Sequence, residues 1–182
     1  VGSEMCIRDR TVPYRCNFAT DDQFALWNVI DANNDKYTWK RETTLAAAYY
    51  YYNEDGETGG DDWLVSSPIH LEKDKIYRLK FKLQSYDVGY PEKVAVHLGT
   101  GASVAEQTTL LGDYEIESNT FVEYKVILPE KLESGNYHIS FHCHSEPYMF
   151  ILYVTDVLLE EVSEGVLSGV VTNGQTPLEG VE

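Results

Sequence analysis

The sequence is poor in cysteine, in basic residues and in long apolar runs, and each scarcity excludes a class of protein. Its three cysteines, Cys6, Cys16 and Cys143, form no C-x-x-C pair, so neither a zinc site nor a thioredoxin-like motif is indicated. The 14 Lys and Arg residues face 30 Asp and Glu, a net charge of −16 that excludes nucleic acid as a partner. No apolar run is long enough to cross a membrane, so membrane insertion is not expected.

The chain is instead rich in tyrosine, with 14 Tyr against two Met, and tyrosine suits strands and half-buried sheet faces. Residues 76–83 alternate strictly, with Tyr77, Leu79, Phe81 and Leu83 on one face and basic residues on the other, which predicts a strand. Further strands are predicted over residues 94–98, 121–128, 137–143 and 150–159. Many short strands separated by turns indicate an all-β sandwich or jelly roll.

Residues 44–48 alone have a helical composition, and they are too few to form a stable helix by themselves. In the segment Asp61–Leu71, Pro68 lacks a backbone N–H and so predicts a strand edge, kink or bulge. For Cys16 and Cys143, a disulfide is one alternative, and two free buried thiols are the favoured one.

Composition divides the chain into three parts. Residues 1–10 show neither strand nor helix periodicity and resemble non-native read-through, so they are excluded from the fold. Residues 11–162 form the predicted β domain. Residues 163–182 are predicted to be a linker and the truncated start of a second β (Ig-like) module, because they resemble the opening strands of carboxypeptidase-regulatory-like modules. We therefore expect further domains in the same protein.

The segment Asp31–Tyr37 carries oxygen-bearing side chains at alternate positions, namely Asp31, Asn33 and Asp35. With the Tyr37 carbonyl as a fourth donor, this pattern suits Ca²⁺, which takes six to eight hard oxygen ligands. An EF-hand is excluded because Lys36 stands where that loop needs glycine. The alternative is an Asx-rich turn between strands, in which the side chains bond their own backbone.

Other polar and aromatic residues allow weaker hypotheses. Tyr86 and Tyr90 flank a short loop before Pro91 and are the candidate ligand-binding residues, since binding residues concentrate on loops held by a scaffold. Trp27 and Trp63 are predicted to be core residues. His138, His142 and His144 share one strand face, where a zinc site is disfavoured against a half-exposed surface. Asp61 and Asp62 are either charges that protect a strand edge or binding residues.

Six segments taken in order resemble the cleaved-adhesin, or choice-of-anchor, domain of Bacteroidetes surface and secreted proteins, the group that includes the gingipain haemagglutinin/adhesin modules and is related to MAM domains. The resemblance covers residues 13–161, and the segments are Phe24–Asp31, Asp31–Trp39, Asp61–Leu71, Pro91–Gly101, Ser134–His142 and Tyr153–Val157. It implies a jelly-roll β-sandwich of two antiparallel sheets that binds calcium and serves adhesion or ligand binding.

The resemblance also makes Asp156 a candidate calcium ligand, although two positions depart from the family pattern. Ala19 follows Phe18 where the family usually has an acidic residue, and Thr155 precedes Asp156 where the family often has a second Asp. The metal set expected from the sequence is therefore Asp31, Asn33, Asp35, Tyr37 and Asp156.

Together these features predict a non-catalytic, calcium-stabilised binding module, secreted or displayed at the cell surface, whose partner is an extracellular protein or glycan. No G-x-S-x-G motif supports a hydrolase. The alternatives are a carbohydrate-binding module attached to a secreted glycoside hydrolase and a structural spacer in a secreted peptidase.

Overall fold

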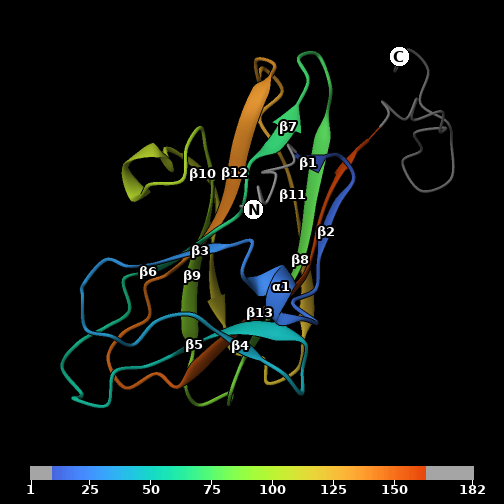
Figure 1. The fold of residues 1–182 in the computed structure, drawn as a ribbon. Coiled ribbons are helices and arrows are strands. Elements are labelled where there is room, and N and C mark those ends of the chain that lie inside the picture. The colour runs from blue at the N-terminus through green and yellow to red at the C-terminus, as the bar shows by residue number, and fades with distance from the viewer. Residues whose placement is uncertain (1–9, 163–182) are drawn as a thin grey trace, which may run out of the picture.

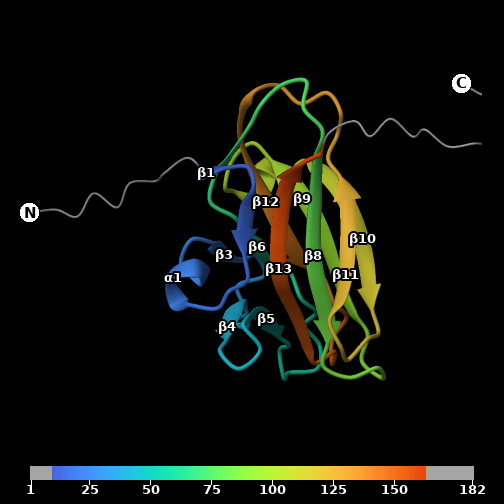
Figure 2. The same cartoon turned by 90° about the vertical axis from the view of Figure 1, so that its right-hand side faces the viewer.

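Two β-sheets packed face to face make up the protein in a computed structural model that describes residues 10–162 (Figures 1 and 2). The predicted second module in residues 163–182 lies outside the described residues, as do residues 1–9 of the excluded N-terminal segment. Arg10, which the sequence analysis excluded from the fold, pairs with Ile69 in the first strand.

The first sheet has seven strands, and β12 (Gly135–Cys143) lies at its centre. On one side β12 pairs with β6 (Asp62–Val65) and β7 (Ile69–Leu71), and on the other with β9 (Glu92–Gly99). The sheet is completed by β1 (Arg10–Thr11), β3 (Asn28–Asp31) and β10 (Thr109–Ile116). All its pairings are antiparallel except that of β1 with β7.

The second sheet has six strands and is built around β13 (Ile151–Glu161). One edge of β13 pairs with β8 (Tyr77–Ser85), which in turn pairs with β11 (Val122–Ile127). The other edge pairs with β5 (Ala47–Tyr51) and β2 (Tyr14–Cys16), and β4 (Lys40–Glu42) pairs with β5. This arrangement confirms the predicted jelly-roll sandwich.

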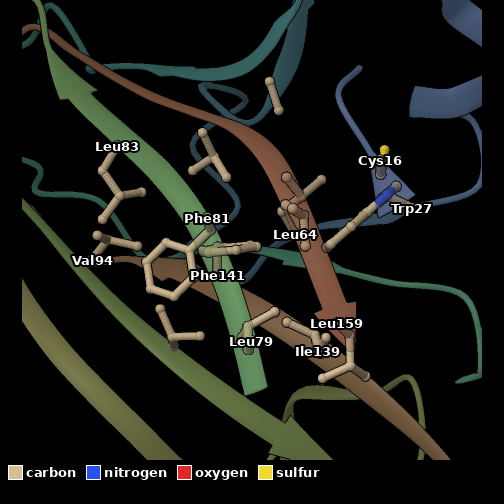
Figure 3. Close-up of a cluster of buried hydrophobic side chains, with 14 of the residues drawn as sticks. Cys16, Trp27, Leu64, Leu79, Phe81, Leu83, Val94, Ile139, Phe141 and Leu159 are labelled. Atoms are coloured by element: carbon tan, nitrogen blue, oxygen red, sulfur yellow. The ribbon is translucent and has the colours of Figure 1, made fainter. Parts of the chain in front are cut away.

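The core lies between the sheets and follows from strand alternation. In β8, Tyr77, Leu79, Phe81 and Leu83 are all buried, as predicted. Phe141 from the opposing sheet is fully buried and meets Phe81 edge to face, with ring centroids 5.3 Å apart (Figure 3). Removing this much apolar surface from water is the main force holding the sheets together.

Two short helical segments connect the strands. The helix α1 (Asp21–Phe24) begins at Thr20, whose hydroxyl accepts a hydrogen bond from the backbone N–H of Gln23. The 3₁₀ helix η1 (Val104–Glu106) is closed by a capping box between Ser103 and Glu106. Within residues 10–162, no helix has the length and apolarity needed to cross a membrane.

Three local expectations change in the structure. The helix-like stretch at residues 44–48 is divided between a turn, which ends at Ala46 with a positive φ of 47°, and the first two residues of β5. Strand β10 was not predicted, because its residues Leu110 and Leu111 interrupt alternation at a bulge. Trp63 is buried as expected but is absent from the central core, and its ring stacks on His142 instead, with centroids 4.0 Å apart.

Cys16 and Cys143 are both buried and free, which confirms the favoured alternative. Burial raises the pKa of both thiols above its ordinary value. Since the thiolate is the reactive form, these cysteines behave as small apolar core residues.

Candidate ligand-binding rim

Four loops that cross from one sheet to the other gather at the lower end of the sandwich in Figures 1 and 2. They are residues 32–39 between β3 and β4, 52–61 between β5 and β6, 86–91 between β8 and β9, and 144–150 between β12 and β13. These loops together form the rim. Because both sheets fix their ends, the rim is a set of loops on a rigid scaffold, where binding residues commonly lie.

The acidic segment of the rim is organised by its own backbone. The Asp35 N–H donates to the side-chain oxygens of Asp31 and Asn33, each at 3.1 Å, and the Lys36 N–H donates to Asp31 at 2.9 Å. Asn33 donates from its amide to the Gly59 carbonyl at 3.0 Å, which ties the first two rim loops together. The structure therefore shows the Asx-turn arrangement that the sequence analysis kept as an alternative.

Asp62 completes this acidic corner from the neighbouring strand. It lies directly opposite Asp31 in the β3–β6 pairing, so the two side chains are on the same face of the sheet. Asp62 is fully buried, its Oδ2 accepts the Asp61 N–H at 3.2 Å, and the Thr38 side chain also hydrogen-bonds its carboxylate. Burial, with Asp31 and Asp35 nearby, raises the pKa of Asp62 to about 7.

The predicted metal residues do not all come together. Asp31, Asn33, Asp35 and Tyr37 share the first rim loop, whereas Asp156 lies on β13 in the other sheet. Asp156 has a φ of 50° at a bulge, and its exposed carboxylate forms an ion pair with Lys82 at 2.7 Å. It lines a separate groove of about 480 Å³ with Lys80 and Lys82. Asp156 is therefore placed apart from the acidic loop.

Next to Asp156, a threonine bridges three segments of the chain. The Thr155 hydroxyl lies 2.6 Å from the carbonyl of Ala46 and 3.2 Å from that of Asn17. Its single O–H can donate to one of these carbonyls at a time. Thr155 therefore joins β13 to the turn at Ala46 or to the segment at Asn17.

In the described part of the chain, no group of three or more His, Cys, Asp or Glu side chains stands ready to hold a metal ion. The donor types at the acidic corner still suit calcium, since carboxylate, amide and carbonyl oxygens are its ligands. The Thr38 side chain hydrogen-bonds the buried Asp62 carboxylate. This corner therefore fits a hard cation through its donor types, with Asp31, Asp35 and Asp62 close together.

Aromatic side chains form a continuous strip across the rim. Tyr86 stacks on Phe150 with centroids 5.6 Å apart, and Tyr90 meets the same ring edge to face at 4.5 Å. The strip continues from Phe150 to Tyr52 at 5.2 Å and on through Tyr51 to Tyr37. Tyr86 and Tyr90 are 55% and 40% exposed, so the strip is open to a ligand at that end.

Tyr148 extends the exposed aromatic surface and locks two loops together. It is 59% exposed and has a φ of 67°. A Cβ atom on Gly56 would lie 2.3 Å from the Tyr148 ring, and Gly56 itself has a φ of 76°. Only glycine fits this position, because it needs both a left-handed backbone and room for the tyrosine.

A buried polar group lies at the ends of β9 and β12. Glu92 is fully buried and accepts a short hydrogen bond of 2.5 Å from the Ser145 hydroxyl. Burial raises the pKa of Glu92 to about 7. Ser145 also accepts from the Lys93 N–H at 2.9 Å, so this group holds the start of the last rim loop against β9.

The histidines of β12 and of the residue that follows it contact carboxylates, a carbonyl and an aromatic ring. His142 lies 2.7 Å from Asp61 and stacks on Trp63, and His144 lies 2.8 Å from Asp113. Burial lowers the pKa of His142. His138 is buried against the Ser66 carbonyl. These histidines are thus partnered side chains of a half-exposed sheet face, as the favoured interpretation holds.

Sequence reasoning found Tyr86 and Tyr90 but not the residues that join them to the acidic loop. Phe150 was predicted only as the first residue of the strand over residues 150–159. Phe150 follows a turn segment, residues 145–149, that contains Pro147 and has no alternation. That signal marks a loop, in which an aromatic residue is more often a surface residue than in a strand.

Comparisons with known proteins agree with the fold. The sequence matches no protein-family model and no curated protein. The structure is similar to the K1 cleaved adhesin domain of Lys-gingipain from Porphyromonas gingivalis W83, with a TM-score of 0.66, 19% identity, and coverage of 82% of this chain and 98% of that one. The K3 domain of the same protein gives a TM-score of 0.62 at 19% identity, covering 81% and 96%.

Carbohydrate-binding modules share the fold as well. The CBM22-2 xylan-binding domain of Paenibacillus barcinonensis Xyn10C has a TM-score of 0.53 at 9% identity, covering 82% of this chain and 99% of that one. At these identities the likeness establishes the architecture alone. The resemblance to gingipain adhesin modules inferred from the sequence is thereby confirmed at the level of fold.

Proposed function

We propose that this protein is a non-catalytic binding module that attaches to an extracellular protein or glycan through the rim. The observation that carries the proposal is the aromatic strip from Tyr86 to Tyr37, which ends in exposed rings on loops fixed by both sheets. Exposed aromatic rings clustered on a rigid scaffold are the usual anchors of a binding surface, because they bury a large area at little entropic cost.

The setting follows from the same fold. Adhesin domains and carbohydrate-binding modules are the similar structures, which supports a secreted or surface-displayed module within a larger protein. A carbohydrate-binding module attached to a glycoside hydrolase is the second candidate function, and the stacked rings of Tyr86 and Phe150 favour it, since sugar rings pack on aromatic faces. A structural spacer is the third candidate, and it predicts no ligand for the rim.

The test replaces exposed rim aromatics and compares them with exposed apolar residues elsewhere. Binding to arrays of extracellular proteins and glycans is expected to fall at least tenfold for Tyr86→Ala and Tyr90→Ala. Leu110→Ala and Ile127→Ala serve as matched controls, because they are 57% and 50% exposed and lie on strands outside the rim. Equal loss in the controls, or no ligand for the wild-type rim, would contradict the proposal.

We also propose that calcium stabilises the rim through the acidic corner. Asp31, Asn33, Asp35 and the Tyr37 carbonyl would hold it, as the sequence predicts, and Asp62 replaces the distant Asp156 as the carboxylate from a second strand. The ion supplies a positive charge beside the buried carboxylate of Asp62, which lies opposite Asp31. Its binding requires the carboxylates of Asp31 and Asp35 to exchange backbone N–H groups for the cation.

A ligand bound only by the folded state raises stability, by about 2.7 kcal/mol at one hundred times its dissociation constant. We therefore expect the melting temperature to rise in millimolar CaCl₂ and to return on chelation. Asp62→Asn and Asp35→Asn should abolish the rise. Asp74→Asn, an exposed carboxylate at the opposite end, should retain it. If the melting temperature does not change with calcium, the calcium site is rejected, and the proposed aromatic binding surface is unaffected.

A further inference from the structure

The rim combines exposed aromatic rings with negative charge that the chain does not neutralise. Its four loops contain one basic residue, Lys36. Against it stand Asp35, Glu54, Asp55, Glu57, Asp61, Asp87 and Glu146. The rim is therefore strongly acidic even for this acidic chain.

Most ion pairs between Lys or Arg and a carboxylate lie outside the rim. Among residues 10–162, Asp21, Glu123, Glu133, Asp156, Glu160 and Glu161 each form an ion pair with Lys or Arg. At the rim only Glu146 has such a partner, Lys93, and Asp61 pairs with His142. Glu54, Asp55, Glu57 and Asp87 form no ion pair within the described residues.

Hydrogen bonds hold three of these carboxylates in place. Asp55 accepts from the N–H groups of Glu57 and Thr58 at 2.8 and 2.9 Å, and these bonds lower its pKa. Glu54 accepts from the Tyr51 hydroxyl at 2.7 Å, and Asp87 accepts from the Gly89 N–H at 2.8 Å. Glu54 and Asp87 thus adjoin the aromatic strip through Tyr51 and Tyr86, and Asp55 follows Glu54 in the same loop.

We propose that the rim binds a cationic protein segment, a stretch rich in lysine and arginine, with its ammonium or guanidinium groups over the rings and against the unpaired carboxylates. This deepens the proposed function, on which it rests, by naming the chemistry of the ligand. A cation lying over the face of a tyrosine ring is attracted by its quadrupole, and the attraction is strongest where water is excluded.

Charge decides between a cationic segment and a neutral sugar. A neutral ligand that covered the strip would remove water from Glu54 and Asp87 without supplying a positive partner, which is costly for a charged group. A cationic segment supplies that partner and is also steered toward the rim by the negative field. The acidic corner of Asp31, Asp35 and Asp62 lies inward of these residues, so calcium there leaves the exposed carboxylates available.

The experiment uses the 182-residue chain and defined probes measured by calorimetry. These are a twelve-residue peptide of alternating Lys, Arg and Gly, the same peptide with Gln in place of the cations, a Glu-containing peptide, and xylohexaose. Only the cationic peptide should bind, and its affinity should fall at least tenfold between 50 and 300 mM NaCl, as charge attraction is screened. Each measurement is made with and without calcium.

Two double charge substitutions and one aromatic substitution distinguish binding at the rim from general attraction to an acidic protein. Asp55→Asn with Glu57→Gln, and separately Tyr86→Ala, should weaken the cationic peptide about fivefold or more. Glu72→Gln with Glu130→Gln removes the same charge at the opposite end and should leave binding unchanged. Thermal melts establish that all variants fold.

Each other outcome overturns the inference. Equal weakening by both charge pairs means attraction to net charge alone. If xylohexaose or the Gln peptide binds and the cationic peptide does not, the cationic ligand is refuted. If Tyr86→Ala also abolishes that binding, the rim remains the binding surface. If no probe binds, the cationic ligand is rejected, and the array test with Tyr86→Ala decides the proposed function separately.

Discussion

At the rim end of the sandwich, exposed tyrosines stand beside carboxylates without ion pairs and one Lys, whereas the two loops at the opposite end hold three Lys with four carboxylates. There, in the β7–β8 and β11–β12 loops, Lys73 pairs with Glu133 at 2.9 Å and Lys75 pairs with Glu161 at 2.8 Å. The Lys73 N–H also donates to the Ser134 hydroxyl at 2.8 Å. The same scaffold therefore closes one end on itself and leaves the other with charge and aromatic surface to offer.

Exposed ion pairs contribute little to stability, so the pairs of Lys73 and Lys75 at the end opposite the rim do not explain why the chain folds. What they remove is unbalanced charge, which would attract ions or partners. At the rim most carboxylates have no such partner, and this is the end at which we propose that a ligand binds.

The core holds both sheets, and so both ends of the sandwich, in place. Disrupting it should therefore destabilise the rim and the opposite end together. Phe141→Ala removes a fully buried ring that contacts Phe81 and Trp27. We expect a loss of about 3–5 kcal/mol in the free energy of unfolding, measured by urea denaturation. Leu110→Ala, on an exposed strand face, should change it by less than about 0.5 kcal/mol. A small loss at Phe141 would mean that the sheets are held together elsewhere.

A glycine in the rim should affect that end alone. Gly56→Ala strains a φ of 76°, at a cost of about 1–3 kcal/mol, and its methyl group displaces the exposed end of the Tyr148 ring. Hydrogen exchange should accelerate in residues 52–61 and 144–150 and stay unchanged in the β7–β8 loop. Gly89→Ala, whose Cβ would lie 3.3 Å from Asp87 Oδ1, is the matched rim control and should have little effect.

The buried carboxylates should make stability depend on pH in a specific direction. The pKa of Asp62 rises from an ordinary 3.8 to about 7 on folding, so the folded state binds more protons than the unfolded state between pH 4 and 7. Stability attributable to Asp62 must then fall as pH rises through that window, by at most about 1.4 kcal/mol per pH unit. Urea melts at a series of pH values without calcium should show a shallower fall for Asp62→Asn. An identical slope would contradict the raised pKa.

The smallest effect is expected at the closed end. Lys73→Ala breaks an exposed pair whose side chains are 54% and 76% accessible, and solvent already screens the attraction. The melting temperature should not change measurably, and neither should binding at the rim. A clear loss of binding would show that the two ends are coupled and that the comparison fails.

Much of the scaffold was predictable from the sequence, because alternation in β8 and β12 reports directly which residues face the core. The rim was predictable only in part. Tyr86 and Tyr90 lie in a recognisable loop, but their contact with Phe150 joins positions about sixty residues apart. The pairing of Asp62 with Asp31 depends on strand register, which local sequence does not specify without the partner strand. Asp156, a candidate calcium ligand from the resemblance, lies apart from the acidic loop, because its position depends on a bulge and on the choice of sheet, which local sequence does not specify.

The Thr155 hydroxyl has a consequence for where such a module can work. Its one O–H can donate to the carbonyl of Ala46 or to that of Asn17, and either bond ties the last strand to an earlier segment with a donor that the chain itself supplies. We expect this contact to persist when calcium is removed. Scarcity of divalent ions would then loosen the ligand-facing loops while the body of the sandwich stays closed, so attachment could be released and regained without unfolding.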